Sequence, residues 1–471
     1  MQRRKFIQQT AIAGAAILTS QYIFASDKNF PIVRTSLALR KFKSKAVEEV
    51  IVSVKKSISN KELAWLFENC FPNTLDTTVD FEIINGKPDT YVITGDIDAM
   101  WLRDSTTQVW PYLSLIKKDE KLQQLIKGVI NRQAKCIILD PYANAFFKDE
   151  KEISMWAKDL TEMKPGIHER KWEIDSLCFP IRLAYGYWKQ TGDISHFDSD
   201  WKEAMNNVIR TFKEQQRFAD KGPYKFERIT GWSMDSVPLG GYGYPTKKVG
   251  LIHSMFRPSD DATIFPFLIP SNIFAAEVLD NLSEIFSLAL KDQAMAATCK
   301  AFSIQLIKAI NDYAIIEHPS FGKIFAFEVN GYGSFNLMDD ANIPGLLSIP
   351  YLTKKFDLNI VQNTRRFALS EENPFFYKGK AGEGIGGPHT GVDTIWPLGI
   401  IIRGLTSADD QEIKTCINIL LKSTADTGFM HEAFHKDDAA KFTRKWFAMA
   451  NTLFGELILK VHAERPHLLE T

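Results

Sequence analysis

Apolar residues recur at helical spacing through most of the chain. Between residues 44 and 71, Val47, Val50, Ile51 and Val54 would share one helix face, and Leu63 begins a second run of the same kind. The same spacing predicts helices over 108–116, 122–138, 176–191, 198–219, 274–291, 293–314, 410–423 and 447–462. Strand signals are few. The best covers 323–329, and 76–91 is compatible with a short strand or an extended loop.

Polar segments that contain acidic residues separate these helical stretches. Each interval between them, about 40 to 85 residues, can hold an antiparallel pair of helices, and such pairs bury their apolar faces against neighbouring pairs. The pattern predicts an all-α fold with few short strands, in which six helical hairpins close into an (α/α)6 toroid. We call the segments the six junctions, expected around one opening of the toroid: 95–105, 172–176, 256–261, 338–344, 386–397 and 428–432.

The chain of 471 residues is predicted to form one domain after an export signal. Arg3 and Arg4 form a twin-arginine pattern, an apolar run follows over 11–18, and Ala25 ends a plausible cleavage site. The apolar run is short for a membrane span. Residues 1–25 are therefore predicted to direct export to the periplasm, and the mature protein is predicted to have no membrane span. No linker rich in Pro, Gly or Ser divides residues 26–471, which are interpreted as a single domain.

Composition argues against some functions. The 57 basic and 57 acidic side chains balance, whereas a nucleic-acid-binding protein normally carries a basic surplus. Aromatic residues make up 12% of the chain, a surplus that suits a carbohydrate cleft as well as a core. The five cysteines show no paired spacing and are interpreted as buried thiols.

The first junction concentrates groups that suit a sugar. Carboxylates and a guanidinium can hold sugar hydroxyls, while an indole face covers the apolar face of the ring. Charges packed so closely need polar partners, and a structural Arg–Asp pair is the alternative. Asp104 or Ser105, at the end of the first junction, is also predicted to cap the next helix. The candidate residues, all within eleven positions, are Asp96, Asp98, Trp101, Arg103 and Asp104.

Further residues in or near the other junctions are predicted to contact substrate. The fifth junction is rich in glycine, so its backbone can approach a ligand closely. The second and sixth junctions add aromatic, acidic and imidazole groups, and a basic residue downstream of the sixth is expected to complete the rim. These candidates are Trp172, Glu173, Asp175, Arg257, His389, Thr390, Asp393, His431 and Arg444.

The third junction holds a candidate general acid. Asp260 and Asp261 follow Arg257 and precede an apolar run. A carboxyl group beside apolar surface has its neutral form favoured, which a general acid requires. Neighbouring side chains diverge, so we expect only one of the two to face the same target as Arg257, and the residues leave open which one.

The sixth junction holds a candidate general base in a string that resembles a zinc motif. His431-Glu432-Ala433-Phe434-His435 spells H-E-x-x-H, which on a helix would place both histidines on one face as zinc ligands. Gly428 immediately precedes the string and no third ligand is signalled downstream. The favoured interpretation is that Glu432 activates water without a metal.

Taken together, these strings resemble glycoside hydrolase family 125, the exo-acting α-1,6-mannosidases. The likeness covers about residues 44–462. Its carriers are 95–105, 172–176, 257–261, 342–351, 388–397, 428–432 and 442–456.

The resemblance implies an (α/α)6 fold and hydrolysis with inversion at the anomeric carbon, without a metal or other cofactor. It implies a mannose-containing oligosaccharide or N-glycan as substrate. The family's acid maps to Asp260, with Asp261 close behind, and its base maps to Glu432. Inversion leaves room for a water molecule, so the two carboxyl groups are expected about 6.5–9.5 Å apart.

Three alternatives stay open at this point. Another (α/α)6 glycosidase is the nearest. A zinc metallopeptidase would use the H-E-x-x-H string, and a non-catalytic mannoside-binding protein would need the hydroxyl-binding groups without opposed carboxylates.

Overall fold

The structure is a computed structural model that describes residues 30–470. Contacts divide the chain into Met1–Ile32 and a body, Val33–Thr471, which is described by itself below. The predicted export signal, residues 1–25, lies outside the described residues. Within residues 30–470, none of the helices is both long and apolar enough to cross a membrane.

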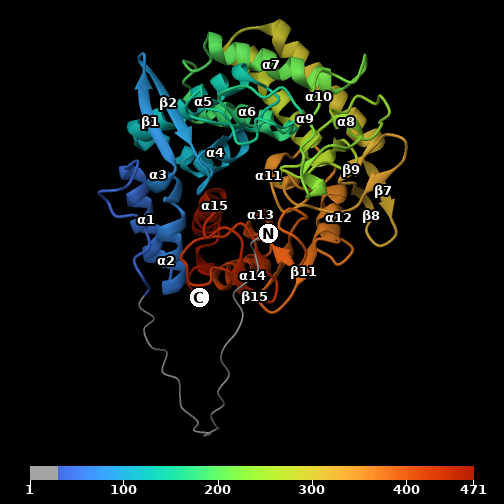
Figure 1. Ribbon diagram of the computed structural model, residues 1–471. Helices are drawn as coiled ribbons and strands as arrows, with labels where there is room; N and C mark the ends of the chain where they lie inside the picture. The colour runs from blue at the N-terminus through green and yellow to red at the C-terminus, as the bar shows by residue number, and fades with distance from the viewer. Residues whose placement is uncertain (1–29, 471) are drawn as a thin grey trace. The chain divides into compact units, whose positions relative to one another are not determined.

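Within residues 33–470, six mostly buried helices form an inner ring (Figure 1). α4 packs against α6, α6 against α9 and α9 against α11, while α13 packs against α15 and α15 against α4. Between α11 and α13 the contact runs through the preceding loops, where the amide of Ala341 donates to the carbonyl of Gly386 at 3.0 Å. The inner helices are α4 (Leu102–Val109), α6 (Ile174–Thr191), α9 (Ile269–Glu284), α11 (Ile349–Leu352), α13 (Pro397–Leu405) and α15 (Ala448–Glu464).

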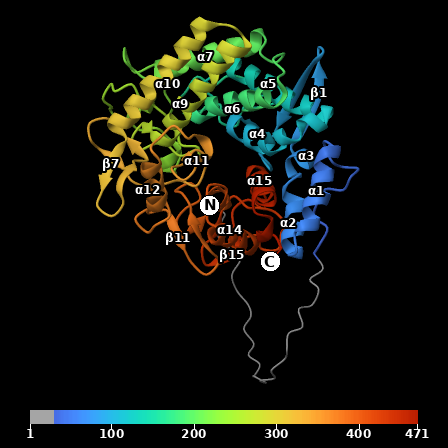
Figure 2. The ribbon, with the colours of Figure 1, turned by 180° about the vertical axis from the view of Figure 1, so that it is seen from behind.

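The outer helices are amphipathic and alternate with the inner ones along the chain. The first outer helices lie beside α15, so the two ends of the body meet and complete the ring (Figure 2). The architecture confirms the predicted (α/α)6 fold. The outer helices are α1 (Lys45–Ser57), α2 (Lys61–Cys70), α5 (Glu120–Leu139), α7 (Ser199–Gln215), α10 (Gln293–Tyr313), α12 (Leu358–Ala368) and α14 (Asp410–Lys422).

The two sets of helices begin differently. Every outer helix named above starts on a Ser, Asn or Asp whose side chain accepts a backbone N–H of the first turn. None of the six inner helices, in the described part of the chain, has a side-chain cap. The prediction that Asp104 or Ser105 caps a helix is therefore wrong. Both lie inside α4, which begins at Leu102 after the short strand β3 (Met100–Trp101).

Other local predictions hold in part. The stretch 76–91 contains a hairpin of β1 (Val79–Ile84) and β2 (Lys87–Val92). The predicted strand 323–329 is divided between β8 (Gly322–Phe325), which pairs with β7 (Ile315–His318), and β9 (Glu328–Val329). The predicted helix 108–116 is mostly a 3-10 segment, Trp110–Ser114, because Pro111 cannot continue the hydrogen-bond ladder of α4. The five cysteines are buried and unpaired, as predicted.

Three small antiparallel sheets link the loops that enter the inner helices. One pairs β3 with β4, which also pairs with β5, and sets Trp101 opposite Ala145. A second pairs β9 with β6 and β10. The third sets Thr394 opposite His435 and so joins the fifth and sixth junctions. The strands not yet bounded are β4 (Ala145–Phe146), β5 (Ile167–Glu169), β6 (Phe267–Leu268), β10 (Phe335–Asn336), β11 (Phe376–Lys378), β12 (Glu383–Ile385), β13 (Thr394–Ile395), β14 (Phe434–His435) and β15 (Asp438–Phe442).

Candidate active site

Two adjoining cavities lie where the junctions enter the inner helices. The inner cavity has a volume of about 260 Å³ and the outer one about 570 Å³. They share four wall residues, Ile97, Trp101, Asp260 and His389. The inner wall consists of Thr94, Ile97, Trp101, Arg103, Asp104, Pro258, Ser259, Asp260, Asn342, His389, Trp396, Glu432, Arg444 and Phe447.

Five of the six junctions reach the inner cavity. The predicted site residues that line it are Trp101, Arg103, Asp104, Asp260, His389, Glu432 and Arg444. Four buried polar atoms of residues that line the two cavities have no hydrogen-bond partner within residues 30–470. They are Trp101 Nε1, Arg103 Nε, His168 Nδ1 and Asp261 Oδ2. Buried polar atoms are normally hydrogen-bonded, so these suit a ligand that carries hydroxyl groups.

Asp260 projects from a tight turn. The amide of Asp260 donates to the carbonyl of Arg257 at 2.9 Å, and the amide of Arg257 donates to the carbonyl of Asp261 at 2.7 Å. Asp260 has φ +68°, a left-handed conformation that Asp tolerates better than most residues. The turn separates the two adjacent acids, so that Asp260 lines the inner cavity and Asp261 only the outer one, while Arg257, whose target one of them was expected to share, lines neither.

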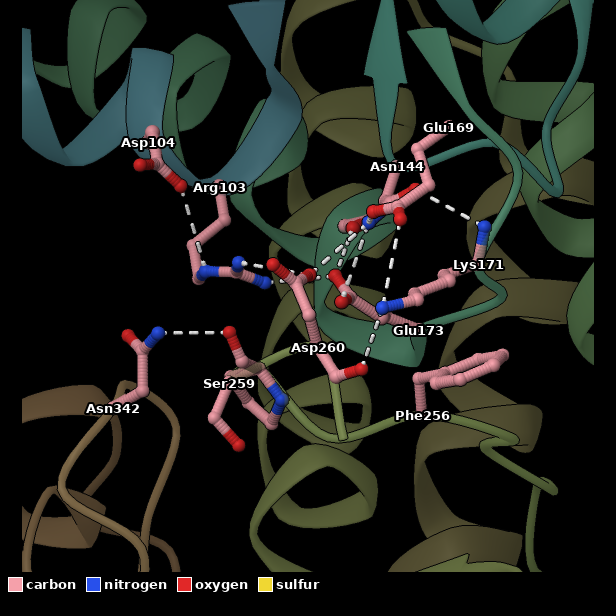
Figure 3. Close-up of polar contacts among 12 residues, drawn as sticks. Arg103, Asp104, Asn144, Glu169, Lys171, Glu173, Phe256, Ser259, Asp260 and Asn342 are labelled. Atoms are coloured by element: carbon pink, nitrogen blue, oxygen red, sulfur yellow. Dashed lines mark hydrogen bonds and ion pairs between the residues drawn. The ribbon is translucent and has the colours of Figure 1, made fainter. Parts of the chain in front are cut away.

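Arg103 lies at the centre of a buried cluster of carboxylates (Figure 3). Its Nη1 lies 2.7 Å from Glu173 Oε2 and 3.1 Å from Asp175 Oδ2. Its Nε is 3.6 Å from Asp104 Oδ2, and its Nη2 is 4.0 Å from Asp260 Oδ1. Asn144 Nδ2 donates to Asp260 Oδ1 at 3.2 Å, and Lys171 Nζ donates to the backbone oxygen of Asp260 at 2.8 Å. One guanidinium thus serves four carboxyl groups.

The protonation of this cluster is uneven. Burial, together with the charges of Asp260 and Asp175, raises the pKa of Glu173 far above its usual range, although Arg103 opposes the rise. Burial also acts to raise the pKa of Asp260, but the charges of Lys171 and Arg103 outweigh it and lower that pKa. Asn144 Nδ2 contacts both carboxyl groups, 3.5 Å from Glu173 Oε1 and 3.2 Å from Asp260 Oδ1, and the opposite pKa shifts place a proton held by the pair mainly on Glu173.

Glu432 lies on the same cavity wall, with its side chain 13% exposed. Arg444 Nη1 is 3.4 Å from Glu432 Oε1. Arg444 is held in turn by Asp96, whose Oδ1 accepts from Arg444 Nε at 2.8 Å, and by the carbonyl of Thr94, which accepts from Nη2 at 2.6 Å. Asp96 of the first junction therefore fixes Arg444, the cation that faces Glu432 of the sixth junction.

His389 lies between the candidate acids. Its Nδ1 is 3.4 Å from Asp261 Oδ1. Burial opposes a charge on the imidazole, but the hydrogen bond to Asp261 and the charges of Asp261, Asp260 and Glu432 raise the pKa of His389 to about 9. At neutral pH His389 is a cation that can donate to a sugar oxygen.

The structure places several predicted substrate contacts away from both cavities. Trp172 is a core residue whose indole N–H donates to the carbonyl of His253 at 2.7 Å. Arg257 is buried and its Nε donates to Glu328 Oε1 at 2.7 Å. Glu173 and Asp175 are buried behind Arg103 and line neither cavity.

The remaining predicted contacts lie near the site but off the inner wall. Asp96 orients Arg444, as described above. Asp98 is exposed. Thr390 accepts from the indole of Trp396 at 2.8 Å, and Asp393 pairs with Lys436 at 2.7 Å. Asp261 lines only the outer cavity.

The H-E-x-x-H string is not helical. Phe434 and His435 form β14, and the ring of His431 stacks on Phe442 with 3.8 Å between centroids. The ring nitrogens of His431 lie 3.1 Å from the carbonyl of Thr424 and 3.2 Å from that of Arg444. The one-face arrangement that a zinc site requires is therefore not formed, and His431 does not line the cavity. In residues 30–470, no group of three His, Cys, Asp or Glu side chains is placed to hold a metal ion.

Wall residues that the sequence prediction missed fall into two classes. Ser259, Asn342 and Trp396 lie inside junctions, so membership of a junction was an available signal. The outer wall comes largely from segments between junctions, for which the helical pattern offers no signal. Those residues are Met155, Trp156, His168, Glu169, Lys171, Arg228, Trp232 and Asp235.

Comparison with known proteins gives matches over most of the chain. A family model described as metal-independent alpha-mannosidase (GH125) matches residues 60–459. The Meiotically up-regulated gene 157 protein of Schizosaccharomyces pombe is 41% identical over 460 residues, which cover 93% of this chain and 90% of the relative.

The chain is also similar to solved structures of glycosidases. A metal-independent α-mannosidase from Streptococcus pneumoniae, in a non-productive substrate complex with α-1,6-mannobiose, is 40% identical with a TM-score of 0.85. The match covers 90% of this chain and 100% of that one. A bacterial glucoamylase complexed with acarbose is 13% identical with a TM-score of 0.50, over 91% of this chain and 58% of that one. The glucoamylase shares the fold alone.

Proposed function

Because the chain belongs to glycoside hydrolase family 125, the metal-independent α-mannosidases, it is a glycoside hydrolase, and we propose that it removes single terminal α-1,6-linked mannose residues with inversion. The observation that carries this proposal is that Asp260 and Glu432, far apart in the sequence, line one small cavity with Arg103 and Trp101. Two carboxyl groups that flank one sugar are the equipment of a glycosidase, and inversion is proposed because the family resemblance implies it.

The chemistry follows from the two acids. Asp260 gives a proton to the glycosidic oxygen as the bond between that oxygen and C1 breaks. Glu432 takes a proton from the water that attacks C1 on the opposite face of the ring. Arg103, Asp104 and His389 hold the sugar from the side of the acid, and Trp101 covers a face of the ring.

The shape of the site supports release of one sugar at a time. Arg444, fixed by Asp96 and by the carbonyl of Thr94, forms part of the inner wall beside Glu432. The wider cavity adjoins on the side of Asp260, where the leaving part of the substrate would lie. The α-1,6 linkage is proposed because the pneumococcal relative was crystallised with α-1,6-mannobiose.

The substrate is proposed to be a mannose-containing oligosaccharide or N-glycan. Export to the periplasm by the Arg3-Arg4 signal also stays a proposal. Fractionation of cells would test this proposal. The amount of protein in the periplasm would be compared between the full chain and a variant in which Arg3 and Arg4 are both replaced by Lys.

One assay tests the proposed reaction. The purified protein, without added metal, is incubated with α-1,6-, α-1,2- and α-1,3-mannobiose, and the product is followed by anomer-resolved NMR. We expect cleavage of the α-1,6 compound first, unaffected by chelator, with β-mannose as the initial product. Initial α-mannose would contradict inversion, and preference for another linkage would contradict the assigned specificity.

A further inference from the structure

The outer cavity is larger than one departing sugar requires. Its volume of about 570 Å³ is about twice the 260 Å³ of the inner cavity. It shares Asp260 and His389 with the inner cavity, so it begins at the bond that the proposed reaction breaks. If the inner cavity holds one mannose, the outer one has room for two further sugars.

The wall of the outer cavity carries exposed apolar side chains. Trp232 is 51% exposed and Met155 is 78% exposed, and both line the cavity with Trp156. Large apolar groups gathered at a concave surface mark binding sites. The C–H face of a pyranose ring is apolar and its rim is polar, which matches an indole with a flat body and an N–H.

The segment that carries Trp232 is firmly held. Asp235, three residues on, pairs with Lys171 at 2.6 Å and with Arg228 at 3.1 Å. The guanidinium of Arg228 lies 3.8 Å from the ring centre of Trp156. The amide of Ala262, next to the acid pair, donates to the carbonyl of Met234 at 2.7 Å. The exposed indole is thus preorganised relative to Asp260, which lowers the entropic cost of binding.

We propose that Trp232, with Met155 and Trp156, binds the second sugar beyond the cleaved bond. This inference rests on the proposed function and specifies its substrate class. The preferred substrate is an oligosaccharide with at least two sugars after the terminal mannose, rather than a disaccharide.

The test compares kcat/KM on α-1,6-linked mannotriose and mannobiose. Wild type is expected to prefer the trisaccharide, and Trp232→Ala is expected to lower that preference about tenfold. Trp232→Phe should restore most of it. Ile229→Ala is the matched control, because Ile229 is 93% exposed on the same segment and lines neither cavity.

The outcomes separate the two hypotheses. If wild type cleaves both compounds and Trp232→Ala keeps the same ratio, the sugar site at Trp232 is wrong and the proposed function stands. If neither compound is cleaved, the proposed function itself is wrong.

A second observation concerns Glu173, which is buried beside the proposed acid. Glu173 Oε2 accepts from Arg103 at 2.7 Å and from Ser176 at 2.8 Å. Asn144 Nδ2 lies between Glu173 and Asp260, 3.5 Å from Glu173 Oε1 and 3.2 Å from Asp260 Oδ1 (Figure 3). When two carboxyl groups share one buried site, the repulsion of two negative charges favours a proton on one of them.

The surrounding charges favour keeping that proton. Arg103, from α4, is the cation that touches Glu173 within the described residues. It is shared with Asp104 of α4, Asp175 of α6 and Asp260. Lys171 is already paired with Asp235 at 2.6 Å and lies 3.5 Å from Glu169. A buried, unbalanced carboxylate is costly.

We infer that Glu173 is a positioning residue that stores the proton delivered by Asp260. This again rests on the proposed function. When substrate binds, the one proton of the pair moves from Glu173 to Asp260, and as the C1–O bond breaks the glycosidic oxygen takes the bond's electron pair and that proton. The attacking water gives one proton to Glu432 and its hydroxyl to C1. Afterwards Glu432 releases a proton to solvent and the acid pair takes one up.

Glu173→Gln tests this role with two substrates. On α-1,6-mannobiose, kcat/KM is expected to fall about 10- to 100-fold. On 2,4-dinitrophenyl α-mannoside the loss should be far smaller, because that leaving group departs without a proton. The alkaline limb of the mannobiose profile should move about one unit or more to lower pH, since Asp260 alone would lose its proton more readily beside Lys171 and Arg103.

Asp175→Asn is the matched control. It also removes a carboxylate from Arg103, and it should lower both activities by similar factors without moving the alkaline limb. Equal losses on both substrates and an unmoved limb in Glu173→Gln would reduce Glu173 to a structural role. If wild type cleaves neither compound, the fault lies with the proposed function.

Discussion

Replacing Glu432 by Gln is expected to lower kcat on α-1,6-mannobiose by about 10³-fold or more, because the amide cannot accept a proton from the attacking water. Gln has the shape of Glu and keeps a hydrogen-bond acceptor for Arg444, which lies 3.4 Å from Glu432 Oε1. The thermal midpoint and the affinity for mannose should therefore change little. Steady-state kinetics, thermal unfolding and calorimetric titration with mannose would measure these quantities.

Glu464→Gln provides the control for this variant. Glu464 is the last residue of α15 and is exposed, so its replacement should leave kcat unchanged. Activity of Glu432→Gln within tenfold of wild type would remove Glu432 from the mechanism.

Asp260→Asn should produce the second large loss, about 10³-fold in kcat/KM on α-1,6-mannobiose. The loss should be much smaller on 2,4-dinitrophenyl α-mannoside, for which protonation of the leaving group is unnecessary. Asp261→Asn is the informative comparison. Asp261 faces His389 at 3.4 Å and is absent from the inner wall, so its replacement should cost less and should not depend on the leaving group. The reverse order would make Asp261 the acid.

Much of the fold was predictable from periodicity. Spacing of apolar residues located most long helices, and the regular placement of polar segments indicated six hairpins. The pattern could not show which polar residues would cap helices. In the structure Asp119, Asp198, Asp292, Asp357 and Asp409 cap outer helices, whereas Asp260 and Glu432, which precede inner helices, line the inner cavity. An acidic residue before a helix can therefore cap that helix or serve the site, and which of the two it does depends on whether the helix is outer or inner.

The candidate site was predictable in outline, because a junction is recognisable by its composition. The composition of a junction did not show which of its side chains would line the cavity and which would be buried in the core. Arg257 belongs to the same junction as Asp260, but its side chain turns into the core and donates to Glu328. Trp172 belongs to the same junction as Glu173, but its indole donates to the carbonyl of His253 in the core. Trp232 was missed because the cavity that it lines with Met155 and Trp156 is assembled from segments far apart in the chain rather than marked by any local pattern.

The ion pair between Arg444 and Asp96 joins residues 348 positions apart. A chain emerging from the ribosome would expose Asp96, and later Asp260, long before Arg444 and Glu432 are synthesised. Until the last inner helix docks beside the first, neither the base nor its counter-charge is available, so hydrolytic competence arrives only after Glu432 and Arg444 have been synthesised. A nicked or prematurely terminated product that lacks this part would be inert toward glycans, even if its remaining hairpins were well packed.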